Sequence, residues 1–337
     1  MTLPLPLPLP LLRKLQEATP ADAWAAIAEH VLEVCDTAGQ GKPADAAARL
    51  RDEGLRALDA WMAGAAWDLW AEFGTAMPRT ADRLVQWWGA VPQGAGAAVA
   101  ILDGLSLREL PLILQGAAAH GFAVISVEAT GAELPGDTNA FAQALGASSR
   151  GTLANNHPPS GFRLAGATTE VADLPWADCA ALVKAEPRWL FWHEWPDVRF
   201  HSGSSFQALA KNTEETFADA NFWAFMRRLA TGRRLLVTSD HGYAHIGGFQ
   251  DTHDDQKAWL RGVFAGGRTA ADGETGAWSP PLAMAVNGRQ ARVRLPLGRR
   301  KWPVPGGNAS LSHGGLTLLE TLSPFIELRR QDSSNAA

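Results

Sequence analysis

Cysteine is scarce in this sequence, with only Cys35 and Cys179 among 337 residues. Two isolated thiols are too few for a disulfide scaffold or a thiolate metal site, so we expect both in the core. Apolar runs of about 18 residues, long enough to cross a membrane, are also missing. The apolar segment 1–16 is interrupted by prolines and lacks the basic region and cleavage site of a signal peptide, and its alternating Leu-Pro pattern predicts an extended arm. These absences predict a cytoplasmic protein that does not act at a membrane.

An excess of basic residues is missing too. Lys and Arg number 30 against 35 Asp and Glu, a formal net charge of −5. This charge excludes the basic surface of a dedicated nucleic-acid binder. It does not exclude a nucleotide-derived substrate, because bound metal ions can supply positive charge.

The chain has two regions that differ in the spacing of their apolar residues. Residues 11–90 have the apolar spacing of helices, with several tryptophans expected at helix contacts. From residue 97 onward, strand patterns such as AAVAIL (97–102) and RRLLVT (233–238) alternate with helical patterns, one of which spans 213–232. This alternation predicts an α/β fold with a mostly parallel central sheet flanked by helices, plus an N-terminal helical region. Residues 265–310 are irregular and predict a long loop with a hairpin.

We therefore expect an N-terminal helical region with a Pro-rich arm at 1–95, a catalytic domain at 96–330 and a disordered tail at 331–337.

Metal-ligand side chains follow the predicted strands at the points where the strands end. In open α/β sheets, ligands bind beyond these carboxyl ends. Carboxylate and imidazole groups suit Zn²⁺ or Mn²⁺, and the i, i+4 spacing of one Asp-His pair allows both side chains to share a face. Taken singly, each Asp could only end a strand or cap a helix, and each His could be structural. The candidates are Asp103, Asp197, His201, Asp240, His241 and His313.

The order of these residues resembles the alkaline phosphatase superfamily, and its PglZ-domain branch in particular. The resemblance rests on AVAILDGLSLRE, ELPGDTNAF, WPDVRFH, LLVTSDHGY and LSHGGLTLLETLSPFIEL, within residues 97–328. It implies an alkaline-phosphatase-like sandwich and a metal site similar to that of nucleotide pyrophosphatases/phosphodiesterases. It also implies a setting in bacterial phage defence or signalling. The helices before residue 95 match no family.

By motif position, the resemblance implies two divalent metal ions, with zinc favoured and manganese as the alternative. Asp103, Asp240 and His241 would hold one ion, and Asp197, His201 and His313 the other. Thr138 would be the nucleophile, activated by a bound cation. The alternative for Thr138 is a helix N-cap, a role that Asp137 could also fill.

Three further residues are candidates for substrate contacts: Asn139, His193 and His245. The favoured activity is hydrolysis of a phosphodiester, either a small molecule or a nucleotide derivative. The alternatives are a phosphomonoesterase and a non-catalytic PglZ-type scaffold or effector subunit that binds a protein partner through the N-terminal helices. No arginine stands beside Thr138 in the sequence to clamp a phosphomonoester. For the basic stretch around Arg289, a solvated hairpin face is favoured over contact with a second substrate phosphate.

Overall fold

The computed structural model describes residues 7–92, 94–246, 253–265, 267–273, 279, 281–300 and 310–331. Five helices come first: α1 (Leu9–Gln16), α2 (Pro20–Thr37), α3 (Ala44–Gly64), α4 (Trp67–Ala76) and α5 (Thr80–Ala90). The later helices are η1 (Leu107–Glu109), α6 (Leu110–Ala119), α7 (Thr138–Ala144), η2 (Arg150–Asn156), α8 (Trp176–Leu182), α9 (Asp197–His201), α10 (Phe206–Ala218), α11 (Ala220–Ala230), α12 (Asp254–Phe264) and α13 (Leu318–Thr321).

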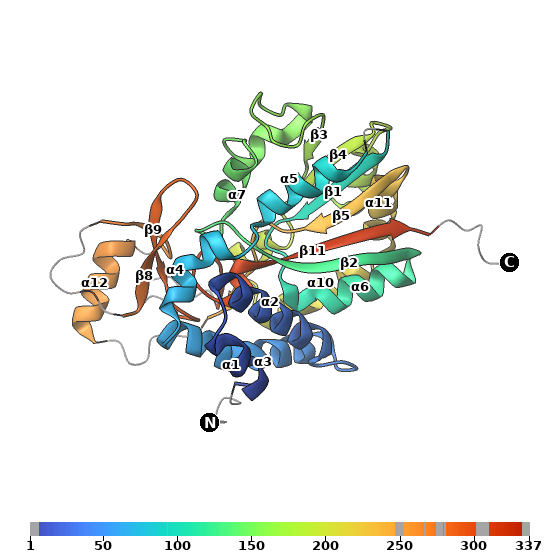
Figure 1. The fold of residues 1–337 in the computed structure, drawn as a ribbon. Helices are drawn as coiled ribbons and strands as arrows, with labels where there is room; N and C mark the ends of the chain where they lie inside the picture. Colours follow the sequence, from blue (N-terminus) through green and yellow to red (C-terminus); the bar gives the residue numbers. More distant parts are fainter. Residues whose placement is uncertain are drawn as a thin grey trace.

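A central six-stranded sheet organises the fold (Figure 1). In spatial order it contains β2 (Phe122–Gly131), β11 (Leu322–Arg330), β5 (Arg233–Thr238), β1 (Gly96–Leu102), β4 (Arg188–His193) and β3 (Thr168–Val171). The pairs β5–β1, β1–β4 and β4–β3 are parallel, and β11 runs antiparallel to both of its neighbours. The expected α/β class, with a mostly parallel sheet between helices, is confirmed.

Buried apolar side chains make β1 and β5 the centre of the core. Val99, Ile101 and Leu236 belong to a cluster on one face, and Ala98, Leu235 and Val237 belong to a cluster on the other. Strands buried on both faces read as continuous apolar runs rather than as alternating patterns. The continuous apolar runs AAVAIL and LLV therefore fit strands that are buried on both faces of this sheet.

The N-terminal helices pack on the sheet region rather than beside it. Trp24, Leu55 and Phe73 share one buried cluster with Leu319 and Leu322 near the C-terminus. Figure 1 shows α1, α2 and α3 together below the sheet. Burial of this shared apolar surface stabilises the arrangement. The division of the chain into domains at residue 95 stays a prediction.

A small lobe lies at one side of the molecule, on the left in Figure 1. It contains α12 and a three-stranded sheet in the order β7 (Ala270–Ala271), β9 (Arg292–Pro296), β8 (Ala283–Asn287). The strands β8 and β9 form the hairpin expected within 265–310. A two-stranded ribbon of β6 (Ala244–His245) and β10 (Leu311–Ser312) leads the chain back toward the main sheet.

One local prediction was wrong, and the extended Leu-Pro arm is contradicted only at its last repeat. The helical pattern over 213–232 forms two helices, because the Asp219 side chain accepts the Asn221 amide proton at 2.8 Å and starts α11 afresh. The Leu-Pro arm lies partly outside the described residues, and its last repeat, Leu9-Pro10, is helical. Proline is tolerated in the first turn of a helix, where its missing N–H has no partner to lose. The expected tail, apart from residue 331, also lies outside the described residues.

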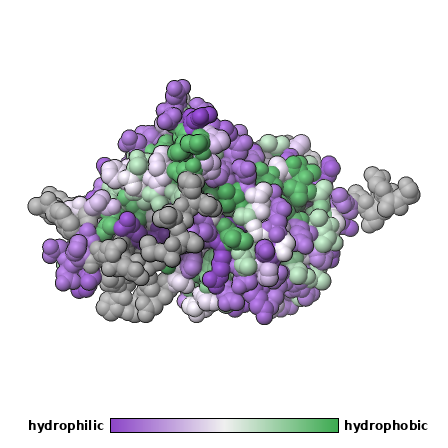
Figure 2. Space-filling view, turned by 90° about the horizontal axis from the view of Figure 1, so that it is seen from below, coloured by the Kyte–Doolittle hydropathy of each residue, from purple (hydrophilic) through white to green (hydrophobic). Residues whose placement is uncertain are grey.

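Cys35 and Cys179 are buried free thiols, as expected. Burial raises the pKa of Cys35 to about 12, so this thiol stays protonated. Within the described part of the chain, no helix is both long and apolar enough to span a membrane. Figure 2 shows hydrophilic residues over much of one face, with hydrophobic patches between them.

Candidate functional site

Three neighbouring parallel strands deliver the candidate ligands to one edge of the sheet. Asp103 directly follows β1. Asp240 and His241 are the second and third residues after β5, and Asp197 opens α9 four residues after β4. The β4–β1–β5 pairing places these chain segments side by side. The backbone N–H of Asp197 also donates to the Asp103 carbonyl at 2.9 Å, which joins two of the strand ends directly.

Asp103, Asp240 and His241 form the first cluster, and all three are buried. The Nε2 atom of His241 lies 3.6 Å from Asp103 Oδ1 and 3.6 Å from Asp240 Oδ2. Thr138 joins them from the start of α7, where its Oγ1 lies 3.2 Å from both Asp103 carboxylate oxygens. Asp137, and not Thr138, caps α7, because its Oδ1 accepts the Ala140 amide proton at 2.8 Å. The alternative of Thr138 as an N-cap is therefore wrong.

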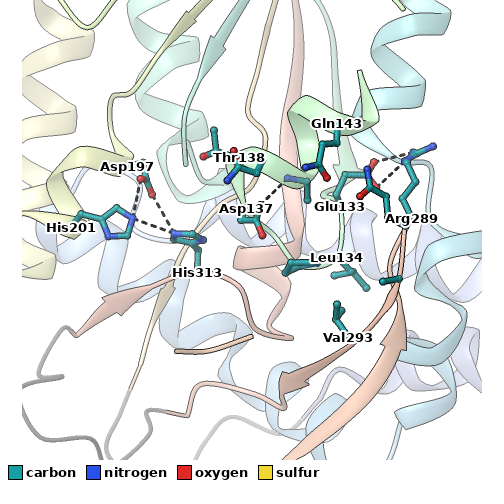
Figure 3. A pocket seen from close by; sticks show the side chains of 15 residues that line it. Glu133, Leu134, Asp137, Thr138, Gln143, Asp197, His201, Arg289, Val293 and His313 are labelled. Carbon is teal, nitrogen blue, oxygen red and sulfur yellow. Dashed lines mark hydrogen bonds and ion pairs between the residues drawn. The ribbon is translucent and has the colours of Figure 1, made fainter. Parts of the chain in front are cut away.

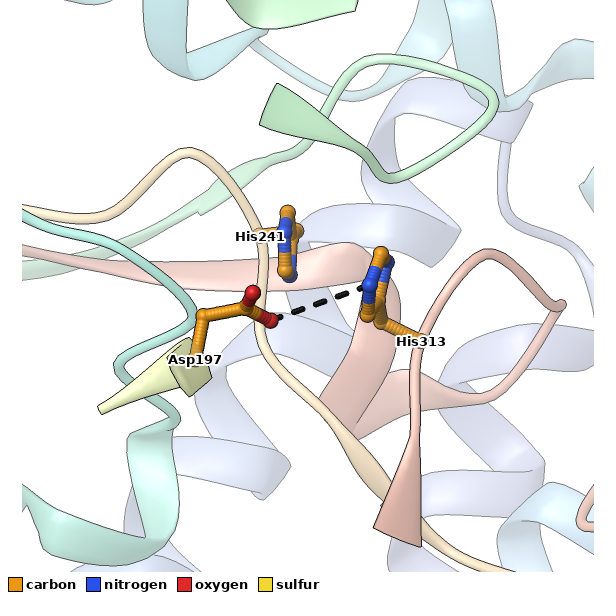
Figure 4. Close-up of side chains that lie close together, drawn as sticks. All are labelled: Asp197, His241 and His313. Carbon is orange, nitrogen blue, oxygen red and sulfur yellow. Dashed lines mark ion pairs between the residues drawn. The ribbon is translucent and has the colours of Figure 1, made fainter. Parts of the chain in front are cut away.

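The second cluster is Asp197, His241 and His313 (Figure 4). The His241 and His313 rings stack with centroids 4.2 Å apart, and His313 Nε2 lies 3.7 Å from Asp197 Oδ1. His201 adjoins this group at its outer side, with its Nε2 3.1 Å from Asp197 Oδ2 and 3.3 Å from His313 Nε2. The His201 side chain is 65% exposed, whereas that of His313 is 19% exposed. All seven residues proposed as ligands or nucleophile thus lie in one continuous site, and the two clusters share His241.

The hydrogen bonds around both clusters leave lone pairs pointing inward. His241 Nδ1 lies 2.9 Å from the Gly242 carbonyl oxygen, and His313 Nδ1 lies 2.8 Å from that of Gly136. A carbonyl oxygen only accepts, so each Nδ1 carries a proton, and in the neutral imidazole each Nε2 then offers a lone pair. A backbone carbonyl on the far ring nitrogen is a common way of orienting metal-binding histidines.

Three buried polar atoms of the clusters have no hydrogen-bond partner among the described residues: Asp197 Oδ1, Asp240 Oδ2 and His241 Nε2. Buried polar atoms without partners are rare and destabilising in a folded protein. All three are acceptors or lone-pair donors, so a cation would satisfy them where a hydrogen-bond acceptor would not. The residues present therefore fit a divalent metal ion.

The pKa shifts of the cluster residues are consistent with a site that binds a cation. Burial, followed by the nearby Asp240 and Asp197, raises the pKa of Asp103 well above its usual value. Burial, followed by His241, lowers the pKa of His313 to about 4, so its imidazole is neutral near pH 7. The hydrogen bond to Asp197 outweighs burial and raises the pKa of His201.

A pocket of about 420 Å³ opens beside the clusters. Figure 3 shows Asp197, His201 and His313 on one side, Thr138 near the middle, and Glu133 with Arg289 on the opposite side. The α7 residues on its wall belong to the main domain, whereas residues 289–291 and 293 come from the β8–β9 hairpin. The pocket thus extends from the clusters to the hairpin.

The three residues expected at the substrate differ in position. Asn139 lines the pocket. His193 does not line it, and its ring nitrogens lie 3.0 Å from the Leu174 carbonyl oxygen and 3.0 Å from the Trp195 amide nitrogen. His245 also lies off the pocket lining, stacked on Phe206 with ring centroids 4.7 Å apart. The substrate roles of these three residues stay predictions, and only Asn139 has the position for one.

The residue pairing at the far end of the pocket was not predicted from the sequence. Glu133 is 2% exposed and accepts two hydrogen bonds from Arg289, at 2.9 and 3.1 Å. A gap of 156 residues separates the partners, so no local pattern predicts that they pair. A buried carboxylate needs a cationic partner, but its burial is visible only in the fold. The solvated hairpin face favoured for the basic stretch does not describe Arg289, which pairs with Glu133 and Asp82 and lines the pocket.

Comparison with known proteins gives likenesses of fold. One solved structure similar to this chain is murine ectonucleotide pyrophosphatase/phosphodiesterase 5, as an inactive variant in complex with AMP. Its TM-score is 0.43 at 12% sequence identity, covering 69% of this chain and 87% of that chain. The human protein of the same name has a TM-score of 0.41 at 11% identity, with the same coverage. No protein-family model matches the chain, and no curated protein matches it. The PglZ resemblance therefore stays a prediction.

Proposed function

We propose that this protein is a metal-dependent phosphoester hydrolase that uses Thr138 as its nucleophile. The observation that carries the proposal is the grouping of six Asp and His side chains in one site, where Asp103 lies 3.2 Å from the Thr138 hydroxyl and three buried polar atoms have no hydrogen-bond partner among the described residues. Buried polar atoms of folded proteins usually have partners, and a bound cation would provide one for these three. The site also opens onto a pocket that can receive an organic group.

Two divalent ions are proposed, with zinc favoured over manganese. Asp103, Asp240 and His241 would hold one of them. Asp197, His201 and His313 would hold the other, with His241 within reach of both. Bound divalent ions at such a site lower the pKa of a hydroxyl group and neutralise charge on a phosphoryl group.

The chain's own residues supply the nucleophile and its orientation. Thr138 Oγ1 attacks phosphorus, its O–P bond forms as the bond to the leaving alcohol breaks, and its proton passes toward the Asp103 carboxylate. Water then cleaves the phosphothreonine ester and regenerates the hydroxyl. His241 and His313 keep their unprotonated Nε2 atoms directed at the site through the carbonyl oxygens of Gly242 and Gly136.

A phosphodiester is the favoured substrate, because the pocket has room for an organic group and its one arginine is already paired with carboxylates. A phosphomonoester is the second candidate. A third is a non-catalytic scaffold or effector subunit of PglZ type in a bacterial defence or signalling system, with a protein partner on the N-terminal helices.

Hydrolysis of bis-p-nitrophenyl phosphate and p-nitrophenyl phosphate tests the proposal with Zn²⁺ or Mn²⁺ present. We expect metal-dependent turnover by the wild type, faster on the diester, and a loss of at least about 100-fold in Thr138→Ala. Full metal-dependent activity in that variant would rule out Thr138 as the nucleophile. A metal-loaded wild type that is inert on a broad ester panel would favour the scaffold alternative.

A further inference from the structure

The end of the pocket away from the metal ligands is built around one guanidinium group. The Nε and Nη2 atoms of Arg289 donate to both oxygens of Glu133, at 3.1 and 2.9 Å. Nη2 also donates to Asp82 Oδ2 at 2.7 Å. Glu133 is buried, whereas Arg289 and Asp82 are partly exposed. Two carboxylates thus fix the plane of the guanidinium, which orients its remaining N–H groups.

The third nitrogen of this guanidinium is free to serve a ligand. Among the described residues, no hydrogen bond joins Arg289 Nη1 to the protein. Arg289 itself lines the pocket. Hydrogen bonding to Glu133 is the largest cause that raises its pKa, so the group keeps its proton. Glu133 balances its charge, and Asp82 is shared between Arg289 and Arg163, so this group of two arginines and two carboxylates has no net positive charge to attract a further anion.

The rest of this end is neutral. Leu134 and Val293 give it an apolar side, as Figure 3 shows, and the side chains of Gln143 and Gln290 can each donate and accept hydrogen bonds. Such a lining suits an uncharged group that has an apolar body and a polar acceptor. A second phosphate or a carboxylate would meet Glu133 and Asp82 before it met an unpaired cation.

We propose that Arg289 determines specificity by donating a hydrogen bond to an uncharged acceptor on the organic group of the ester, and that the Glu133 and Asp82 carboxylates discriminate against anionic groups there. This inference rests on the proposed function, which places the phosphoryl group at the Asp/His clusters. It names the substrate class as phosphoesters whose organic group is uncharged and carries a carbonyl, amide or hydroxyl acceptor.

Binding of non-hydrolysable phosphonates of three kinds to the zinc-loaded full chain, measured by calorimetry, tests this specificity. The ligands are phenylphosphonate and its carbamoyl and carboxy derivatives, each in the 3- and 4-substituted forms. We expect one carbamoyl form to bind about tenfold more tightly than phenylphosphonate, the gain of one hydrogen bond to a charged group. The matching carboxy form should bind no more tightly than the carbamoyl form.

Three variants assign the effect to Arg289. Arg289→Gln should abolish the carbamoyl advantage, so that the carbamoyl form and phenylphosphonate bind this variant with equal affinity. The control, Arg163→Gln, removes another arginine on Asp82 (2.8 Å) that does not line the pocket, and should retain the advantage. Asp82→Asn, at a half-exposed position, should improve binding of the carboxy form severalfold by releasing charge on Arg289.

Equal affinities for all three ligands, no measurable binding, or tightest binding of the carboxy form to the wild type would overturn the inference. An equal loss of affinity for every ligand in Arg289→Gln would also overturn it, because that result indicates a structural role. Calorimetry needs no turnover. If the wild type hydrolyses no ester but shows the Arg289-dependent preference, the specificity stands and the proposed hydrolysis fails.

Discussion

Thr138 Oγ1 lies 3.2 Å from each carboxylate oxygen of Asp103, although 35 residues separate the two along the chain. Asp103 in turn lies 3.6 Å from His241 Nε2. The hydroxyl is thereby fixed where the buried acidic cluster meets the open pocket, since Thr138 also lines that pocket. A nucleophile must be able to reach both a proton acceptor and the substrate, and this position provides both.

The covalent intermediate gives a direct test of Thr138. We expect acid quenching during turnover of p-nitrophenyl phosphate to trap phosphate on Thr138, detectable by mass spectrometry as a phosphorylated peptide. Thr138→Ser should still be labelled, because serine keeps the hydroxyl, and Thr138→Ala should not. Phosphate found on another residue, or equal labelling of the alanine variant, would assign the nucleophile elsewhere.

Asp103→Asn should affect the metal-free and metal-loaded protein in opposite directions. Without metal, Asp103 is a buried carboxylate beside Asp240 and Asp197, so neutralising it removes repulsion. We expect the Tm of the metal-free variant to exceed that of the wild type by roughly 2 °C or more, as about 1 kcal/mol produces in large domains. With zinc the order should reverse, because the variant has lost a ligand. Calorimetric melting with and without chelator measures both.

The metal-free difference should depend on pH in a defined direction. The folded-state pKa of Asp103 is raised, so the folded protein binds more protons than the unfolded chain between the two pKa values. The penalty is therefore absent below the ordinary carboxyl pKa near 4 and grows as the pH rises above it. The Tm gain of Asp103→Asn should vanish near pH 4 and increase toward pH 7. A gain that is largest in acid would contradict this account.

The two outer histidines should contribute unequally to metal affinity. His313 is largely buried, with its ring oriented by the Gly136 carbonyl, whereas the His201 side chain is 65% exposed. A side chain whose orientation is already fixed loses less conformational entropy when it binds a metal ion. We expect His313→Ala to weaken zinc binding by at least about tenfold more than His201→Ala, measured by competition with a chelating dye. Equal losses would show that ring orientation contributes little.

A buried ion-pair network should dominate the attachment of the N-terminal helices. Asp52 of α3 lies 2.6 Å from Arg108 and also pairs with Arg299, and all three are at most 8% exposed. Asp52→Ala would leave two buried cations without their shared partner and should reduce the free energy of unfolding by about 3–5 kcal/mol. The control Glu29→Ala breaks an exposed pair with Lys14 and should change it by less than about 1 kcal/mol. Urea denaturation compares the two, and similar losses would contradict the network's role.

Much of this site could be predicted from sequence because its parts lie at strand ends. Asp103 and Asp240 each follow a short apolar run, and parallel strands bring such ends to one edge. The i, i+4 pair Asp197 and His201 needed only one helical turn to meet. Local pattern and chain direction were sufficient for these residues.

The other features could not be predicted, because they depend on contacts between residues far apart in the sequence. Arg289 meets Glu133 across 156 residues, and Asp52 meets Arg299 across 247. His193 has the spacing of a site residue, yet its ring packs 4.2 Å from that of Trp176 and both nitrogens contact the backbone. Tertiary packing decides such pairs, because a buried charge is evident only once the surrounding residues are in place.

Metal content tests the central claim most directly. Elemental analysis of the full chain, purified with zinc and manganese supplied and then dialysed, should find two divalent ions per wild-type chain. Asp240→Asn should retain fewer, because Asp240 Oδ2 is one of the unpartnered atoms of the first cluster. A wild type that retains neither zinc nor manganese would contradict the account, as would an unchanged metal content in Asp240→Asn.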